Sequence, residues 1–138
     1  MLRPFLKGLP KEFKFALEIR NRNWISWDFV ELLRDHSVAF ALVAQAWMPP
    51  IDRLARALDI VTGDFAYARF IGDRKDIEAK TNRWDKVIED KTTEMTVWTD
   101  ELRKIVNKGV RTYAFFNNHY AGFAPGSVKL FEDLWAKS

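Results

Sequence analysis

With 138 residues, the chain has the length of one domain and can bury a core of its own. Apolar residues make up 48% and charged residues 30%, which excludes a disordered composition. The chain has no cysteine, so disulfides and thiolate metal sites are excluded, and a cytoplasmic location is expected. No apolar run approaches the ~20 residues that cross a membrane. The net charge of +3 is spread among both signs, which does not indicate a nucleic-acid partner.

The first apolar run predicts a strand followed by a helix. In residues 12–20, EFKFALEIR, apolar and polar side chains alternate, which places Phe13 and Ile19 on one face of the predicted strand. Ser26 then suits the N-cap of a helix that continues to about His36.

The second and third runs predict two more strands. Residues 38–47 are almost continuously apolar, as expected for a strand that is covered on both faces. Pro50 suits the first turn of the helix that follows. Residues 65–72 form the third run, and the mixed charges of residues 73–91 predict a solvated connection.

The last part of the chain repeats the pattern. Apolar residues three or four apart predict a helix over residues 93–107, which Gly109 is placed to end. Residues 110–118 form the fourth run, and a helix is expected from about Pro125 with Val128 turned inward. Four strand–helix repeats predict an α/β fold in which parallel strands are joined by right-handed crossovers.

Polar side chains lie where the predicted strands end. In parallel α/β folds, binding groups collect at the carboxyl ends of the strands and in the following loops. These polar residues are Glu18 and Arg20 on the first strand, Gln45 after the second, Arg69, Asp73 and Arg74 around the third, and Asn117, Asn118 and His119 after the fourth. The sequence therefore predicts a site at this edge of the sheet.

Four segments of the chain resemble the YecE-like family, domain of unknown function 72, whose members resemble TIM barrels. They are LEIRNRNW at 17–24, YARFIGDR at 67–74, VWTDELRKI at 97–105 and FFNNHYAGFAPGSVKLFEDL at 115–134. The segments stand in the family's order and span almost the whole chain. The resemblance implies a TIM-like barrel with a pocket at the carboxyl ends of its strands.

The resemblance covers only the C-terminal half of the family. A (β/α)8 barrel typically needs ~250 residues, so the chain is expected to form one domain, 1–138, equivalent to half of such a barrel. Half a barrel leaves unpaired edge strands and an exposed apolar inner face. A homodimer is therefore expected, since two copies would close both edges, or else a complex with a chain that supplies the missing half.

Two positions depart from the family pattern. The family often has an acidic residue where Gln45 stands, and it tends to have a histidine where Ile71 stands. An amide in place of a carboxylate removes a possible base, and isoleucine in place of histidine removes a proton carrier. Both departures weaken any inherited chemistry and favour a non-catalytic scaffold.

Each candidate residue has a functional and a structural interpretation. Glu18 and His119 are the candidates for acid–base catalysis, and Arg20, Arg69, Asn117, Asn118 and Gln45 are the candidates for binding a small polar or anionic ligand. Alternatively, Arg69 simply pairs with Glu18, and one of the two adjacent asparagines holds the turn. Trp24 and Trp47 are expected between helices and Trp98 in the core.

No cofactor or reaction can be assigned from these residues. A metal site is not expected, because Glu18 is the only natural partner for His119 and metal sites use three or four protein ligands. The leading hypothesis is a pocket for a small polar or anionic ligand, and the alternative is a half-barrel scaffold. Nucleic-acid binding is supported only by the slight basic excess.

Overall fold

The computed structural model describes residues 2–137 and shows the expected α/β architecture. Within these residues, four parallel strands form one sheet in the order β1-β2-β3-β4. The strands are β1 (Ala16–Leu17), β2 (Ala39–Ala44), β3 (Phe65–Phe70) and β4 (Arg111–Phe116). Each strand therefore lies beside the next one in the sequence.

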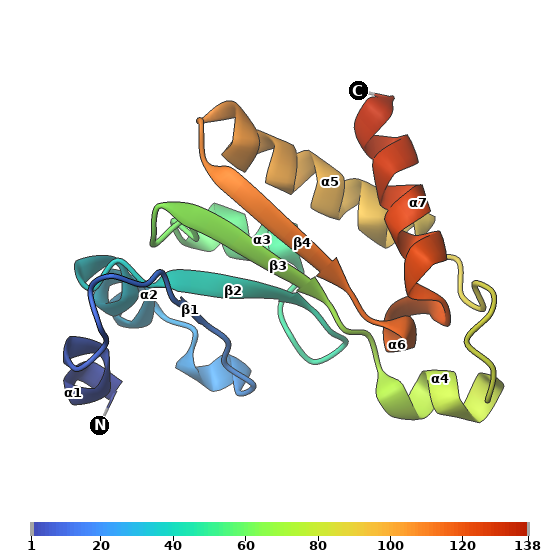
Figure 1. The fold of residues 1–138 in the computed structure, drawn as a ribbon, viewed down its shortest axis with the longest axis horizontal. Coiled ribbons are helices and arrows are strands. Elements are labelled where there is room, and N and C mark those ends of the chain that lie inside the picture. Colours follow the sequence, from blue (N-terminus) through green and yellow to red (C-terminus); the bar gives the residue numbers. More distant parts are fainter. Residues whose placement is uncertain (1, 138) are drawn as a thin grey trace.

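Helices connect the strands. Because the strands are parallel, the carboxyl ends of the strands lie at one edge of the sheet. The helical elements are α1 (Leu2–Lys7), the 3-10 turn η1 (Arg22–Trp24), α2 (Trp27–Asp35), α3 (Ile51–Ala57), α4 (Arg74–Lys80), α5 (Thr92–Asn107), α6 (Asn118–Ala121) and α7 (Ala124–Ala136). In Figure 1 the arrowheads of β3 and β4 point toward α4 and α6. The loops at this edge carry the candidate site.

Aromatic packing joins the sheet to α5 and α7. The ring of Phe70 on β3 stacks on Phe116 of β4 at 4.3 Å between centroids. Trp98 of α5 and Phe131 of α7 meet the Phe70 ring edge-on at 4.9 Å and 6.1 Å. Trp98 is buried, as the sequence predicted. Edge-to-face pairs of this kind add to the stability that comes from burying apolar area.

The second strand is buried along its whole length, but the first is shorter than predicted. All residues of β2 are buried, as its continuous apolar run predicted. Only Ala16 and Leu17 of the predicted strand 12–20 form β1, and Phe13 is 64% exposed. The alternating pattern predicted a longer strand than the one that forms. The reason is that β1 lies at the edge of the sheet, where only β2 offers hydrogen-bond partners.

Several finer expectations about helices and tryptophans were wrong. Val128 lies on the exposed side of α7, and Trp24 and Trp47 are exposed rather than packed between helices. Part of the predicted connection 73–91 forms α4, which buries a single apolar side chain, that of Ile77. One buried residue in so short a helix leaves no periodic pattern to detect.

Ser26 caps α2 as predicted. Its side chain accepts a hydrogen bond from the backbone N–H of Phe29 at 3.2 Å. This bond satisfies one of the N–H groups that the first turn of a helix leaves without a partner.

One face of the sheet is exposed. On β3 the side chains of Ala66, Ala68 and Phe70 are buried against the helices, whereas the alternating side chains, including that of Tyr67, are only partly buried. On β4, Tyr113 and Phe115 lie on this second face and are 43% and 52% exposed. We call the face that carries Tyr67, Tyr113 and Phe115 the open face.

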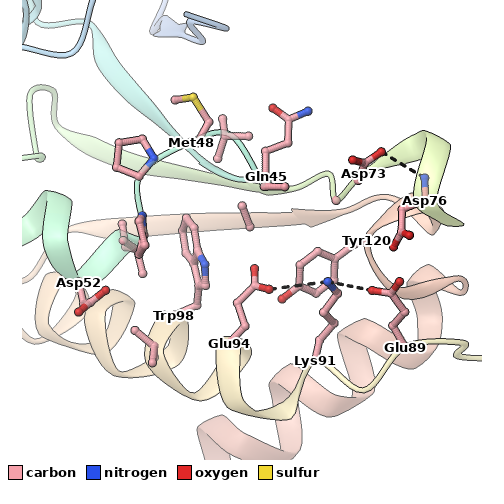
Figure 2. A pocket seen from close by; sticks show the side chains of 18 residues that line it. Gln45, Met48, Asp52, Asp73, Asp76, Glu89, Lys91, Glu94, Trp98 and Tyr120 are labelled. Atoms are coloured by element: carbon pink, nitrogen blue, oxygen red, sulfur yellow. Dashed lines mark hydrogen bonds and ion pairs between the residues drawn. The ribbon is translucent and has the colours of Figure 1, made fainter. Parts of the chain in front are cut away.

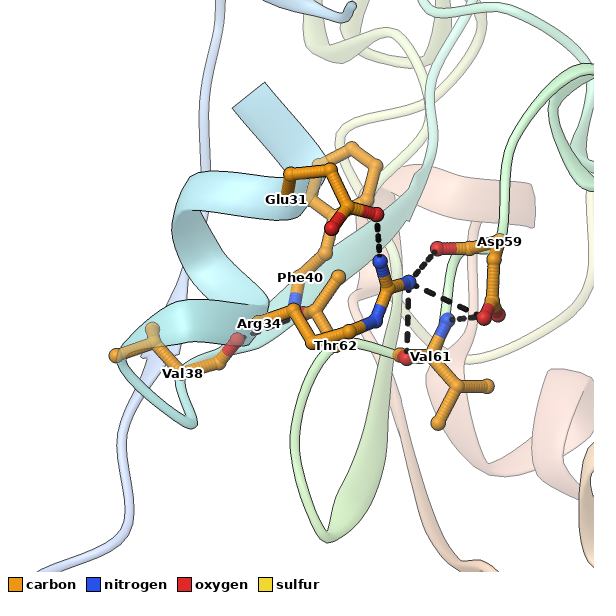
Figure 3. Close-up of polar contacts among 7 residues, drawn as sticks. All are labelled: Glu31, Arg34, Val38, Phe40, Asp59, Val61 and Thr62. Atoms are coloured by element: carbon orange, nitrogen blue, oxygen red, sulfur yellow. Dashed lines mark hydrogen bonds and ion pairs between the residues drawn. The ribbon is translucent and has the colours of Figure 1, made fainter. Parts of the chain in front are cut away.

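Polar contacts close the opposite edge of the sheet, where the strands begin (Figure 3). The hydroxyl of Thr62 donates to the carbonyl of Val38 at 2.6 Å and accepts from the N–H of Phe40 at 2.8 Å. The guanidinium of Arg34 donates to the carbonyl of Asp59 at 2.8 Å and also pairs with Glu31. These contacts join α2, β2 and the segment before β3, and so stabilise this edge of the sheet.

Candidate functional site

The predicted site residues lie at the carboxyl edge of the sheet, but they form three separate groups. Glu18, Arg20 and Arg69 form one group beside the open face. Asn117 and His119 belong to a second group with α4. Gln45 lines a cavity between β2, β3 and α5.

The first group contains two guanidinium groups around one carboxylate. The carboxylate of Glu18 accepts a hydrogen bond from Nη1 of Arg69 and lies 3.4 Å from Nε of Arg20. The side chain of Glu18 is 17% exposed and that of Arg20 is 79% exposed. Glu18 therefore orients Arg69, while most of the Arg20 side chain is exposed to solvent.

A shallow hollow of about 510 Å³ adjoins this group. Glu18 and Arg69 line it together with the rings of Tyr67, Tyr113 and Phe115 from the open face. The hollow combines Glu18 and Arg69 at one end with aromatic rings along the strands, and Lys14, which pairs with Asp64, lines it as well. Such a surface can hold a small anion that carries an apolar or sugar-like body.

The second group contains a histidine between two oxygen acceptors. Nδ1 of His119 lies 2.9 Å from Oδ1 of Asn117, and Nε2 lies 3.3 Å from Oε1 of Glu78. The Oδ1 of Asn117 also accepts from the backbone N–H of His119, which fixes the orientation of that amide. Each ring nitrogen therefore faces an oxygen to which it can donate when it carries a hydrogen.

Arg74 holds the carboxylate of Glu78 beside the histidine. Nε of Arg74 donates to Oε1 of Glu78 at 2.7 Å, and this hydrogen bond lowers the pKa of Glu78, with His119 adding to the effect. The ring of Trp84 meets the His119 ring edge-on at 5.0 Å. Among the described residues, these polar and ring contacts connect His119 to α4 and the loop after it, and none connects it to Glu18.

Asn118 has a structural role in this fold. Its Oδ1 accepts from the backbone N–H of Ala124 at 2.8 Å, which ties α6 to the start of α7. The sequence predicted that one of the two adjacent asparagines holds the turn, and Asn118 makes that contact. Asn117 caps α6 and contacts His119, so it is the asparagine that remains beside a titratable group.

The segment after β3 is fixed by a glycine and an aspartate. Gly72 adopts φ +70°, and a Cβ at this position would overlap the backbone of His119 and Tyr120. Asp73 caps α4 by accepting from the N–H groups of Lys75 and Asp76. The close approach of Gly72 brings α4 and α6 together and so creates the contact between Glu78 and His119.

Sequence reasoning missed several charged residues near this edge. Glu78 was part of the predicted solvated connection, and Glu89, Lys91 and Glu94 precede or begin the predicted helix 93–107. The capping aspartate Asp73 was the local signal that could have revealed α4 and hence the position of Glu78.

These features define a class of protein: an α/β chain with an all-parallel sheet whose polar residues gather at the carboxyl edge of the strands. Within residues 2–137, no helix is long and apolar enough to cross a membrane. The family model for "Protein of unknown function DUF72" matches residues 1–138, and the chain belongs to this family. No relative among curated proteins matches the chain.

Solved structures of DUF72 family proteins share the fold. A protein from Thermotoga maritima is 24% identical with a TM-score of 0.69, and the match covers 98% of this chain and 50% of that one. A protein from Enterococcus faecalis is 18% identical with a TM-score of 0.65, and the match covers 99% of this chain and 53% of that one. The chain therefore spans about half the length of the solved structures that it matches.

Proposed function

We propose that the chain binds a small anionic ligand at the carboxyl ends of its strands, in the hollow beside the open face. The observation that carries the proposal is the charge of the first group: among the described side chains there, Arg20 and Arg69 share the single carboxylate of Glu18. This arrangement leaves one surplus positive charge. A phosphate or carboxylate on the ligand would supply the missing negative charge and could accept two hydrogen bonds from a guanidinium.

The two arginines have different roles in this proposal. Arg69 already donates to Glu18, so it orients the carboxylate and contributes to the local potential. Arg20 does not line the hollow itself, but its guanidinium lies 3.4 Å from Glu18, which does. Arg20 is the group that contacts the anion at this end of the hollow, because its side chain is the more exposed of the two. The aromatic rings of Tyr67 and Phe115, whose centroids lie 5.2 Å apart, would support the remainder of the ligand.

The experiment is a titration with glucose 6-phosphate and inorganic phosphate, followed by NMR chemical shifts of backbone amides. Arg20→Gln should weaken binding at least tenfold. Arg111→Gln is the matched control, because Arg111 is also exposed but begins β4 at the opposite edge of the sheet. If the two variants weaken binding equally, or if the wild-type chain shows no saturable binding, the proposal is wrong.

Proton transfer is the further role proposed for two residues. Glu18 is in contact with both arginines and therefore lies beside the proposed anion. His119 has both ring nitrogens engaged, so it can exchange a proton with a ligand only after it leaves Asn117 or Glu78. Glu18→Gln and His119→Gln would separate these roles in any reaction found for the bound ligand.

The second candidate function is a half-barrel scaffold that works as a homodimer or with a chain supplying the missing half. The open face supports it, because Tyr113 and Phe115 are large side chains left exposed on a sheet. The half-length match to the solved structures points the same way. A second copy facing the open face would cover these rings and supply parallel strands to both edges.

Light scattering after size-exclusion chromatography tests the homodimer. A dimer would have twice the 16.2 kDa mass of the chain at micromolar concentration. Phe115→Glu should convert it to a monomer, whereas Val128→Glu on α7 should leave it intact. A wild-type monomer across the concentration series would overturn the homodimer and leave the complex with a different chain to be tested by co-expression.

A further inference from the structure

A second cavity, of about 630 Å³, lies at the carboxyl edge on the side of the sheet that packs against α5. Figure 2 shows it from close by. It lies between the loop after β2, the turn after β3 and the first turns of α5. Its apolar lining includes Met48, Pro49 and Trp98. Its polar lining includes several charged side chains and the ring of Tyr120.

Tyr120 has a buried hydroxyl that makes no hydrogen bond of normal geometry within the described part of the chain, although the carboxylate of Glu94 lies close to it. The residue is 1% exposed, and its hydroxyl oxygen is the buried side-chain polar atom left unsatisfied. Burial raises the pKa of this hydroxyl, and the nearby carboxylate of Glu94 adds to the effect. The hydroxyl hydrogen can point toward the carboxylate of Glu94, which leaves the buried oxygen without a donor.

The charges around the cavity are predominantly negative. Among the described lining residues, the carboxylates are Asp52, Asp73, Asp76, Glu89 and Glu94, and the single cationic side chain is Lys91. Most of these carboxylates make an ion pair or cap a helix, as follows. Asp52 pairs with Arg56, Asp73 caps α4, Asp76 pairs with Lys80, and Glu89 pairs with Lys80 and Lys91.

Among the lining carboxylates that have a cationic partner, Glu94 has the longest ion pair, and its side chain is 44% exposed. Its Oε2 lies 3.8 Å from Nζ of Lys91, whereas the same ammonium lies 3.0 Å from Oε2 of Glu89. The Lys91 ammonium also lies 5.4 Å from the centroid of the Tyr120 ring. Figure 2 shows the carboxylate of Glu94 beside the Tyr120 hydroxyl, with Lys91 between Glu94 and Glu89. The carboxylate of Glu94 and the hydroxyl oxygen of Tyr120, which lacks a donor, therefore lie next to each other.

We propose that this cavity binds a small organic cation, a primary amine on a short apolar body. The ligand ammonium takes the place of Lys91 at Glu94 and donates to the carboxylate and to the hydroxyl oxygen of Tyr120. Lys91 keeps its closer partner Glu89. The apolar body of the ligand lies against Met48, Pro49 and Trp98. The ligand therefore contacts both the apolar and the charged lining of the cavity.

The test uses butylamine, with butanol and butyrate as neutral and anionic compounds of similar size. Titrations of the full chain are followed by NMR shifts of the amides of residues 91–98 and of Tyr120. We expect saturable binding of butylamine, with butanol and butyrate at least tenfold weaker. Glu94→Gln should weaken butylamine binding at least tenfold, and Tyr120→Phe should weaken it severalfold.

Glu101→Gln is the matched control, because Glu101 lies on the same helix but not in the cavity. It should leave butylamine binding unchanged. A parallel titration with calcium ions tests for a metal site. Tighter binding of butanol, butyrate or calcium ions than of butylamine would overturn the proposal. Loss of butylamine binding in Glu101→Gln would overturn it too. Absence of saturable amine binding by the folded wild-type chain would overturn it as well. The outcome is independent of the phosphate titration, since neither Arg20 nor Arg69 lines this cavity.

Discussion

Arg69 on β3 pairs with Glu18, which follows β1, across the intervening strand β2. The two residues are 51 positions apart, and only the parallel order of the strands brings them together. Two residues that the sequence offered as site candidates, Glu18 and Arg69, therefore also form a structural ion pair. Arg69 holds the carboxylate, and Arg20 is left as the exposed cation.

Replacing each arginine by glutamine should separate these two roles. Arg69→Gln removes the partner of a carboxylate that is only 17% exposed, so it should lower the free energy of unfolding by about 1–2 kcal/mol, between the values typical of exposed and buried pairs. Arg20→Gln should change it by less than about 0.5 kcal/mol, because its side chain is mostly exposed. Urea unfolding measures the change in free energy for each variant. Equal losses would contradict the structural role given to Arg69 and the exposed role given to Arg20.

Thr62 should be the most sensitive hydroxyl at the amino edge of the sheet. Thr62→Val removes one acceptor and one donor, and it leaves the N–H of Phe40 buried without a partner. We expect a loss of about 1–3 kcal/mol in the free energy of unfolding. Thr96→Val removes an exposed hydrogen bond on α5 and should cost less than about 0.5 kcal/mol. Similar costs for the two variants would refute the buried role of Thr62.

Two glycines with similar dihedral angles should respond differently to alanine. Gly72→Ala forces a side chain into the left-handed region at φ +70° and into the backbone of His119 and Tyr120. Gly109→Ala meets the same left-handed strain at φ +82° but has open space around it. We expect Gly109→Ala to cost about 1–2 kcal/mol and Gly72→Ala about 1–3 kcal/mol more, because of the overlap. Thermal or urea unfolding measures the difference, and equal costs would contradict the close approach.

Glu89 should make stability depend on pH in acid. Its hydrogen bond with Lys80, aided by Lys91, lowers the pKa of Glu89 from 4.5 to about 2. Because the folded chain holds the ionised form more tightly than the unfolded chain does, the stabilisation is complete above pH 4.5. It is lost as the pH falls from 4.5 toward 2. The advantage of the wild type over Glu89→Gln in urea should therefore shrink across this range.

Glu132→Gln, an exposed position on α7, is the control for the acid series. Its small difference from the wild type should stay constant as the pH falls. A difference between wild type and Glu89→Gln that grows below pH 4.5 would show that the sign is wrong.

Tyr120→Phe should not destabilise the folded chain. The variant removes a buried hydroxyl that makes no hydrogen bond of normal geometry to the described residues, and it keeps the ring against Phe70 and Phe116. The free energy of unfolding should change by less than about 1 kcal/mol, or rise, because the desolvation cost of the hydroxyl disappears. A loss of several kcal/mol would mean that the hydroxyl has a partner in solution.

The pattern of residues along the chain determined the fold class and where the site residues would gather. Continuous apolar residues in 38–47 and the spacing of Met95, Trp98 and Leu102 require burial wherever the chain folds, so β2 and α5 were predictable. The position of Glu18, Gln45, Arg69 and Asn117 at strand ends followed from the same pattern. The hydrophobicity of each residue and the spacing of apolar residues are written in the sequence itself, which is why these buried elements can be inferred from it.

Only the tertiary structure decided how those residues divide into groups. It paired Glu18 with Arg69 rather than with His119, and it gave His119 the partner Glu78 from a helix that has no periodic signal. It also brought Glu94 to the buried hydroxyl of Tyr120. These contacts depend on side-chain directions at the ends of separate elements and on the close approach at Gly72. No local preference encodes such distances, because they are set by the packing of the whole sheet against its helices.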